Sequence, residues 1–186
     1  MSISVDQARE LMHEWVESAS LRTHMECVAA CMSWYAARVQ PDRQDDWVVA
    51  GLLHDMDYEK HPTIEEHPFV CVEHLKTRGD VPEDVVRAIL SHADYSGAPR
   101  DTDMARHLFA VDELAGFITA CSRVRPDGIV ELETKSVRKK LKNLKFAAAV
   151  SRDDVARGAE EIGVDLPDHI TNCIDALRGE RERLGI

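Results

Sequence analysis

The residues that could do metal chemistry centre on His54 and Asp55, an imidazole beside a carboxylate at the end of an apolar helical run. Such a pair can bind a divalent cation from one short piece of backbone, because the imidazole supplies a nitrogen and the carboxylate one or two oxygens. The carboxylate can also bridge two metal ions. In a chain with nine histidines this dipeptide alone is weak evidence, so its meaning depends on which other residues the fold brings to it.

Four further residues of suitable type flank the pair. His24 precedes it, and His67, His92 and Asp112 follow it, each on or beside a predicted helix. His24 falls on the apolar stripe of its helix and is therefore expected to face inward. Asp112 also falls on an apolar stripe, where a buried carboxylate is costly unless a partner such as a metal ion compensates its charge.

The elements that must position these residues are predicted to be helices. No period-2 strand pattern of useful length, internal repeat or low-complexity segment occurs, so the sequence predicts an all-α fold. Helical spacing runs from Val5 to Val39 with a break at residues 18–20, and further helices are predicted from Asp45 to the central pair, from Pro68 to Arg78, from Pro82 to Ser91, from Asp101 or Thr102 past Ile118, and over Lys135–Leu144, Asp153–Ile162 and Pro167–Leu184.

Length and charge limit the class of protein. A chain of 186 residues suits one domain with a full core. We expect residues 1–186 to form a single domain, with its core at about 20–123 and C-terminal helices at about 134–185 packing on it. The net charge of −11 disfavours general nucleic-acid binding.

The cysteines and the N-terminus bear on the compartment. The five cysteines are an odd number, and most lie inside apolar helical pattern, as reduced core thiols do. No apolar run approaches membrane-spanning length, and the first residues lack the pattern of a signal peptide. We therefore expect a cytoplasmic protein without a membrane segment.

The order His, His-Asp, His, His, Asp resembles the HD-domain superfamily of metal-dependent phosphohydrolases, whose dinuclear members have six ligands in this order. The runs 21–25, 51–59, 89–95 and 109–118 and the tail at 135–141 look like a small single-domain subfamily. The resemblance implies a helical bundle with a metal site between helices and one or two divalent ions (Fe, Mn, Co, Ni or Zn). It makes Asp55 the bridging ligand and assigns His24, His54 and Asp112 to the first metal and His67 and His92 to the second.

Some positions depart from the superfamily pattern. Many dinuclear members continue the pair as His-Asp-Ile-Gly-Lys, with the lysine helping to hold the substrate anion, whereas Asp57 and Tyr58 occupy the Gly and Lys positions here. Beside Asp55, the carboxylates of Asp57, Glu59 and Glu113 are candidates for proton delivery to a leaving group. Each of these three can also be a surface or helix-pairing carboxylate.

Two further assignments concern basic residues and the loop before His67. The basic run at 135–145 has one apolar face, which is typical of a solvated helix. Its functional interpretation is that Arg138 and Lys140 overhang the metal site and bind a phosphate. His61 lies in the same irregular loop as His67 and is the alternative ligand.

Three functions fit these features. The first is a phosphohydrolase that cleaves a phosphoester of a small metabolite or nucleotide by a metal-bound hydroxide. The second is a mixed-valent di-iron oxygenase, which shares the six-ligand order within the superfamily. The third is a non-catalytic ligand-binding module. The expected partner is a small phosphorylated substrate, and the sequence predicts no oligomeric state.

Overall fold

The computed structural model describes residues 2–186, which form helices and no β-strand. The all-α prediction is confirmed. The helices are α1 (Val5–Trp15), α2 (Ala19–Val39), α3 (Gln44–Leu53), α4 (Phe69–Arg78), α5 (Glu83–Ser91), α6 (Asp103–Arg123), α7 (Thr134–Leu141), α8 (Arg152–Glu161), α9 (Leu166–Gly179) and α10 (Arg181–Leu184), with short 3-10 turns at Pro41–Arg43 and Asp94–Ser96.

Local sequence signals set several helix ends. At the start of α1, the Ser4 hydroxyl accepts the Gln7 amide while the Gln7 side chain accepts the Ser4 amide, which is a complete capping box. The Ser18 side chain caps α2, so the serine-rich break separates the first two helices as predicted. Gly79 ends α4 in the left-handed conformation, with φ of 71°.

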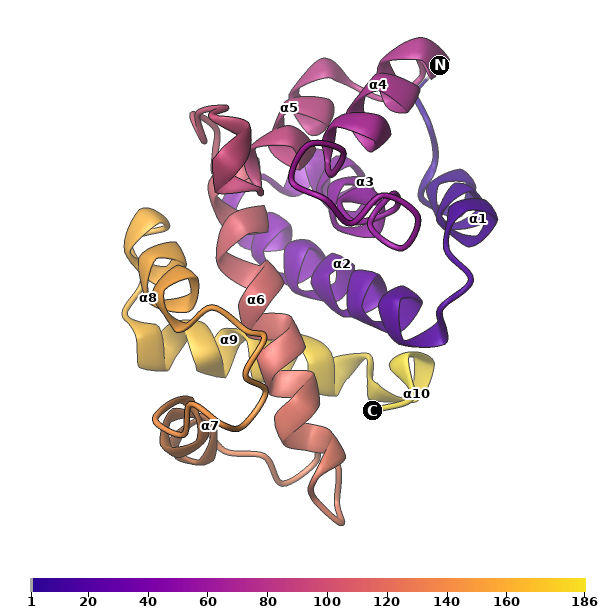
Figure 1. The fold of residues 1–186 in the computed structure, drawn as a ribbon. Helices are drawn as coiled ribbons and strands as arrows, with labels where there is room; N and C mark the ends of the chain where they lie inside the picture. The colour runs from indigo at the N-terminus through magenta and orange to yellow at the C-terminus, as the bar shows by residue number, and fades with distance from the viewer. Residues whose placement is uncertain (1) are drawn as a thin grey trace.

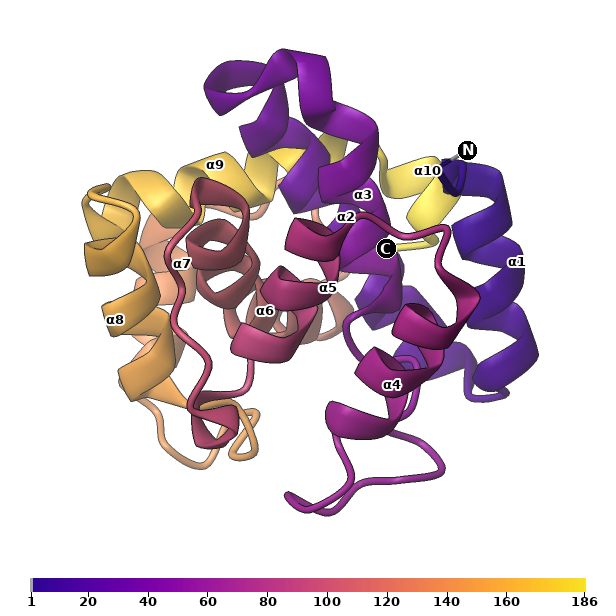
Figure 2. The ribbon, with the colours of Figure 1, turned by 90° about the horizontal axis from the view of Figure 1, so that it is seen from above.

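The two longest helices, α2 and α6, pack on each other at the centre of the molecule (Figure 1). Helix α3 packs on α2, and α5 packs on both α3 and α6, so these helices cover one end of the central pair. Seen from above, α8 lies on the opposite side of the molecule from α1 (Figure 2). Helices α2, α3, α5 and α6, which carry or directly precede candidate metal ligands, thus pack together around one region.

Close helix crossings depend on two glycines. A Cβ atom on Gly51 would lie 2.6 Å from the Cα atom of Ala29, so α3 can approach α2 this closely only without a side chain there. Gly158 has the same relation to Ala110, which brings α8 against α6. The first crossing sets the separation of the backbone that carries His24 from the backbone that carries His54.

The C-terminal helices differ from their predicted bounds. The helix predicted over 167–184 is two helices, because the chain turns at Glu180, where ψ is 9°. Helix α7 ends at Leu141 rather than Leu144, and the chain continues in turns to Val150. Helix α7 buries only Val137 and helix α10 only Leu184, so helical periodicity alone fixes the ends of these two helices poorly.

The five cysteines are free and buried, as the sequence predicted. In the described part of the chain, no helix combines the length and the apolar character needed to cross a bilayer.

Candidate metal centre

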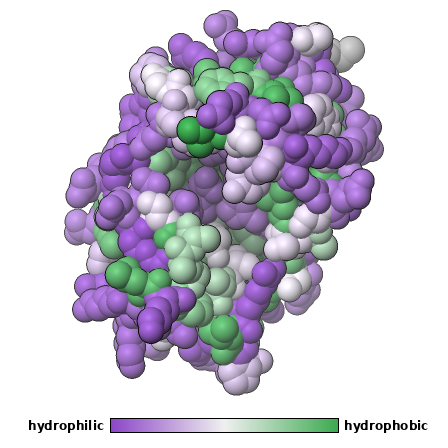
Figure 3. Space-filling model, in the orientation of Figure 1, coloured by the Kyte–Doolittle hydropathy of each residue, from purple (hydrophilic) through white to green (hydrophobic). Residues whose placement is uncertain are grey.

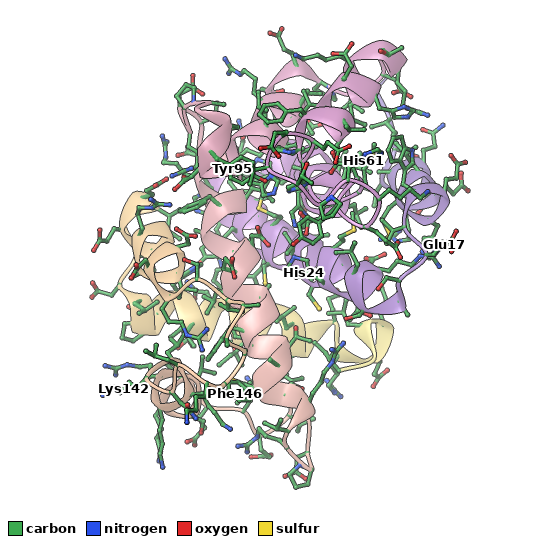
Figure 4. All side chains as sticks on the ribbon, in the orientation of Figure 1. Glu17, His24, His61, Tyr95, Lys142 and Phe146 are labelled. Atoms are coloured by element: carbon green, nitrogen blue, oxygen red, sulfur yellow. The ribbon has the colours of Figure 1, made fainter. Side chains whose placement is uncertain are left out.

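The six predicted ligands lie together although they come from five separate parts of the chain. His24 is on α2, and Asp112 is on α6. His54 and His92 are the residues directly after α3 and α5. His92 lines the cavity, and His54 is buried behind Asp55, which also lines it. The cavity opens beside His24, near the middle of the molecule and close to α6 (Figure 4).

Backbone carbonyls hold two of the imidazoles in a fixed orientation. Nδ1 of His54 lies 2.9 Å from the carbonyl oxygen of Gly51, and Nδ1 of His92 lies 2.6 Å from that of Ile89. A carbonyl oxygen can only accept, so Nδ1 carries the proton and donates it in each neutral ring. The Nε2 atoms are then left as electron-pair donors, each 3.5 Å from an oxygen of Asp55.

Asp57 orients the third imidazole. Its Oδ1 atom accepts a hydrogen bond from Nδ1 of His67 at 2.7 Å, and its Oδ2 atom accepts the backbone amide of Cys71 at 2.7 Å. The Asp57 side chain is completely buried and both its oxygens are engaged. A carboxylate behind a metal-binding histidine fixes the ring and increases its basicity.

The carboxylate of Asp55 lies between two groups of imidazoles. Its Oδ1 atom is 3.4 Å from Nε2 of His67 and 3.5 Å from Nε2 of His92. Its Oδ2 atom is 3.5 Å from Nε2 of His54 and 3.7 Å from Nε2 of His24. Each oxygen thus faces a different group of nitrogens, and the two groups could each hold a metal ion.

Asp112 adds an oxygen to the first group. Its Oδ1 atom lies 3.0 Å from Nε2 of His24 and 3.5 Å from Nε2 of His54. Nε2 of His54 is buried and forms no hydrogen bond. An electron-pair donor buried without a partner is costly, and a metal ion would satisfy it.

The second group, His67 and His92, also has electron pairs without a partner. Nε2 of His67 lies 3.3 Å from Nε2 of His92. Because the Nδ1 atoms of both rings already donate, two lone pairs face each other in the neutral state. A cation between them would remove this repulsion, so the donors present fit a metal ion in this group as well.

The charges of the site favour a cation. Burial opposes a charge on His54, yet Asp55 and Asp112 raise the pKa of its imidazole to about 9. The site thus favours a positive charge at Nε2, which a proton supplies in the absence of metal and a bound metal ion would supply in its place. Burial also opposes ionisation of Asp55, but the neighbouring imidazoles hold the pKa of its carboxyl well below its ordinary value. All six donors are nitrogen or oxygen, which suits Fe, Mn, Co, Ni or Zn.

The structure places two of the residues predicted to be catalytic outside the lining of the cavity. Asp57 does not line the cavity, because its carboxylate is turned towards His67 and Cys71. Glu59 accepts the backbone amides of Glu17 and Ser18 in the link between α1 and α2, which directs it away from the site. Asp57 instead supports His67 from behind, and Glu59 joins the loop after α3 to the link between α1 and α2.

Glu113 is the proton-delivery candidate that does line the cavity. It lies beside Asp112 on α6, and one of its oxygens accepts the backbone amide of Ser151 at 3.2 Å. Burial and the neighbouring Asp112 raise the pKa of its carboxyl to about 7.

The two basic residues predicted to bind phosphate are not at the metal cavity. Arg138 is exposed and lines no part of it, and Lys140 lines a different cavity. Their helix, α7, packs on α9 and α6 at the far end of the molecule from α5 (Figure 1). The periodicity of α7 predicted its apolar face, but the place where that face docks depends on the rest of the fold.

The open alternative between His61 and His67 has a clear geometric answer. His61 pairs with Glu66 at the surface, with 3.1 Å between Nδ1 and Oε1, whereas His67 is buried among the other donors.

Two other histidines, His169 and His107, lie in the core. Nδ1 of His169 accepts a hydrogen bond from the Tyr35 hydroxyl, and its Nε2 atom donates to the carbonyl of Ala110.

The metal cavity has a volume of about 550 Å³, which suits a small molecule. Half-exposed Tyr58 and Tyr95 lie on its rim, and Phe109 lines its wall. In the space-filling view this face is hollowed near its centre, and apolar residues border the hollow (Figure 3). None of the described residues that line the cavity is a lysine or arginine.

Arg152 holds the loop that forms one wall of the cavity. Its guanidinium donates to the backbone carbonyls of Ala147 at 2.6 Å, Val150 at 2.7 Å and Asn143 at 3.3 Å, and also to that of Phe146. Ala147 has a φ of 45°, which a residue with a side chain adopts only when its surroundings impose it. The sequence pattern did not reveal this role of Arg152.

The fold and the donors define an all-helical protein with a site of nitrogen and oxygen ligands suited to divalent metals. A family model of the HD domain matches residues 21–116, which include all six predicted ligands. The chain therefore belongs to the HD domain family, whose members are generally metal-dependent hydrolases. No curated protein and no solved structure matches the chain.

Proposed function

We propose that this protein is a phosphohydrolase that depends on two divalent metal ions and cleaves a phosphoester of a small metabolite or nucleotide. The observation that carries the proposal is the position of Asp55, whose two oxygens face two separate groups of imidazoles. A carboxylate placed in this way is what a pair of neighbouring metal ions requires.

Each residue of the site has a distinct part in this proposal. His24, His54 and Asp112 would hold one ion, His67 and His92 would hold the other, and Asp55 would contact both. When bound, the ions supply an activated water and positive charge for displacement at phosphorus. Asp57 keeps His67 in the tautomer that offers Nε2 to the cavity.

The cavity supports a small substrate. Its volume of about 550 Å³ is enough for a phosphorylated metabolite or a mononucleotide. Tyr58, Tyr95 and Phe109 offer aromatic surface to the organic part of such a molecule. Glu113 is the lining carboxylate from which a proton could reach a departing alkoxide.

The first test is the metal content and activity of Asp55→Asn, which keeps the shape of the side chain and removes its charge. Gently purified wild-type protein should contain close to two metal ions per chain and release phosphate from p-nitrophenyl phosphate. The variant should lose both ions and all measurable turnover, because an amide has one neutral oxygen in place of the two charged oxygens that the two groups of imidazoles share. Retained turnover would refute the assignment of Asp55.

A matched pair of histidine variants controls this test. His67→Ala removes a buried donor, whereas His61→Ala removes a surface imidazole from the same loop. We expect the first to lose one ion and turnover, and the second to behave as wild type.

The di-iron oxygenase remains the alternative with the same ligand order, and oxygen dependence separates the two. Hydrolysis supported by Mn²⁺ or Zn²⁺ without O₂ would support the phosphohydrolase. Turnover that requires iron and consumes O₂ would replace it with the oxygenase. Tight metal binding without turnover on a broad substrate panel would point to a binding module.

A further inference from the structure

A second cavity, with a volume of about 480 Å³, lies between the end of α6, the loop that follows it and α7. It is separate from the metal cavity, because the two share no lining residue. Three cationic side chains border it, namely Arg125, Lys139 and Lys140. Val124 and Leu132 give it an apolar part.

The three cations have no carboxylate partner in residues 2–186. The ion pairs of this region join Lys135 to Glu133 and Arg178 to Asp175 and do not include them. Lys140 contacts the ring of Phe146, with 4.2 Å from its Nζ atom to the ring centroid. Three cations without a carboxylate partner around one hollow are unexpected in a chain with a net charge of −11. They create a local positive potential that would attract an anion.

The hydrogen-bonding groups of the cavity are also incompletely used. Arg125 donates through Nη2 to the carbonyl of Glu131, but its Nε atom is buried without a partner. Asn143 uses its Oδ1 atom to accept the amide of Lys145, which leaves its NH₂ group as a donor. The Ser136 hydroxyl adds a further donor at the same cavity.

From this arrangement we infer that the cavity bordered by Arg125, Lys139 and Lys140 binds the phosphate of a small organic phosphate monoester. Guanidinium, ammonium, hydroxyl and amide donors are the groups that bind phosphate oxygens. The apolar side chains of Val124 and Leu132 would contact the organic part of the ligand.

The metal cavity offers a contrast that supports this choice. Its described lining contains no lysine or arginine, so its own side chains do not attract an anion. The second site therefore does not depend on the proposed function. It can be tested in protein from which metals have been removed, and in Asp55→Asn.

The experiment is titration calorimetry of chelator-treated protein with phenyl phosphate and with inorganic phosphate. Wild-type protein and Asp55→Asn should both bind phenyl phosphate saturably and more tightly than inorganic phosphate. Lys139→Ala should weaken binding about tenfold, as loss of one charge-assisted contact predicts. Arg125→Gln should have a similar effect.

Lys142→Ala is the matched control. It removes the same charge from the residue directly after α7, where Lys142 is exposed and does not line the cavity (Figure 4). Binding should be unchanged in this variant. No saturable binding to wild-type protein, or equal weakening by Lys139→Ala and Lys142→Ala, would overturn the inference.

Nuclear magnetic resonance tests whether phenyl phosphate binds at the second cavity. On addition of phenyl phosphate, the amide signals of Ser136 and Asn143 should shift and those of His54 and His92 should not. The reverse pattern would overturn the inference.

Sedimentation with vesicles that contain phosphatidic acid tests whether the phosphate belongs to a lipid. If the protein sediments with the vesicles and Lys139→Ala abolishes this, the site binds a lipid headgroup. If the protein binds only the free ligand, the site binds a soluble phosphate.

Discussion

At the scale of single residues, the site depends on which atoms lie behind the metal donors as much as on the donors themselves. Three imidazoles donate through Nδ1 to an oxygen of the protein, and each therefore presents Nε2 to the cavity. Two of those oxygens are backbone carbonyls, which no substitution of a side chain removes. The third belongs to Asp57, so the orientation of His67 can be tested by mutation.

We predict that Asp57→Asn lowers the affinity for the second metal ion about 10- to 100-fold. An amide can accept from His67 or face the amide of Cys71, but its NH₂ group cannot accept the second hydrogen bond. The ratio of metal to chain should fall from near two towards one, as measured by elemental analysis after dialysis. Circular dichroism should show that the helices remain.

Glu59→Gln is the control for this prediction. Glu59 is two residues away and its carboxylate accepts two backbone amides, but it contacts no histidine. The metal content of Glu59→Gln should equal that of wild type. An unchanged metal ratio in Asp57→Asn would show that His67 does not need this carboxylate.

Periodicity was enough to predict the inward direction of His24 and Asp112, because each lies on the apolar stripe of a long helix. The role of Asp57 could not be predicted in the same way. It depends on the path of residues 58–68, which returns His67 to the end of α3, and no repeating pattern encodes that path. For the same reason, the sequence indicated that α7 is basic but not where it docks.

At the scale of helices, the crossing of α2 and α3 at Gly51 controls the distance between the first two histidines. We predict that Gly51→Ala destabilises the protein by about 1–3 kcal/mol, because the new Cβ would meet the backbone of Ala29 and force the helices apart. Urea unfolding should give a lower midpoint. Metal affinity should fall with it, since His24 and His54 would separate.

Gly179→Ala provides the comparison, because a Cβ atom there meets nothing within 4 Å. Its unfolding midpoint should be equal to that of wild type or slightly higher, as alanine favours a helix over glycine. Equal midpoints for the two alanine variants would mean that α3 can shift on α2 without loss.

At the scale of the whole molecule, the hydrogen bonds of His169 connect three helices. It lies on α9, accepts from Tyr35 on α2 and donates to the carbonyl of Ala110 on α6. Burial lowers the pKa of its imidazole to about 4. The ordinary value for histidine is about 6.5, so the unfolded chain binds a proton in a range where the folded protein does not.

We therefore predict that the free energy of unfolding decreases as the pH falls from about 6.5 towards 4, with a contribution from His169 of about 3 kcal/mol. The contribution is fully present above pH 6.5 and is lost on acidification. Because other groups titrate in the same range, the measurement is the difference between wild type and His169→Gln in metal-free protein. A difference independent of pH would contradict the prediction.

The hydrogen bonds from Arg152 to four backbone carbonyls affect which parts of the cavity wall can change in sequence. That guanidinium holds the backbone of the loop at 143–150, and the side chains of Phe146, Ala147 and Val150 also pack against the core. Ala149, by contrast, is exposed and lines the metal cavity. A change at Ala149 can therefore alter the entrance of the cavity, while the backbone of the loop and the helices that carry the candidate ligands stay as they are. Access to the cavity and retention of the proposed metal ions can then change separately.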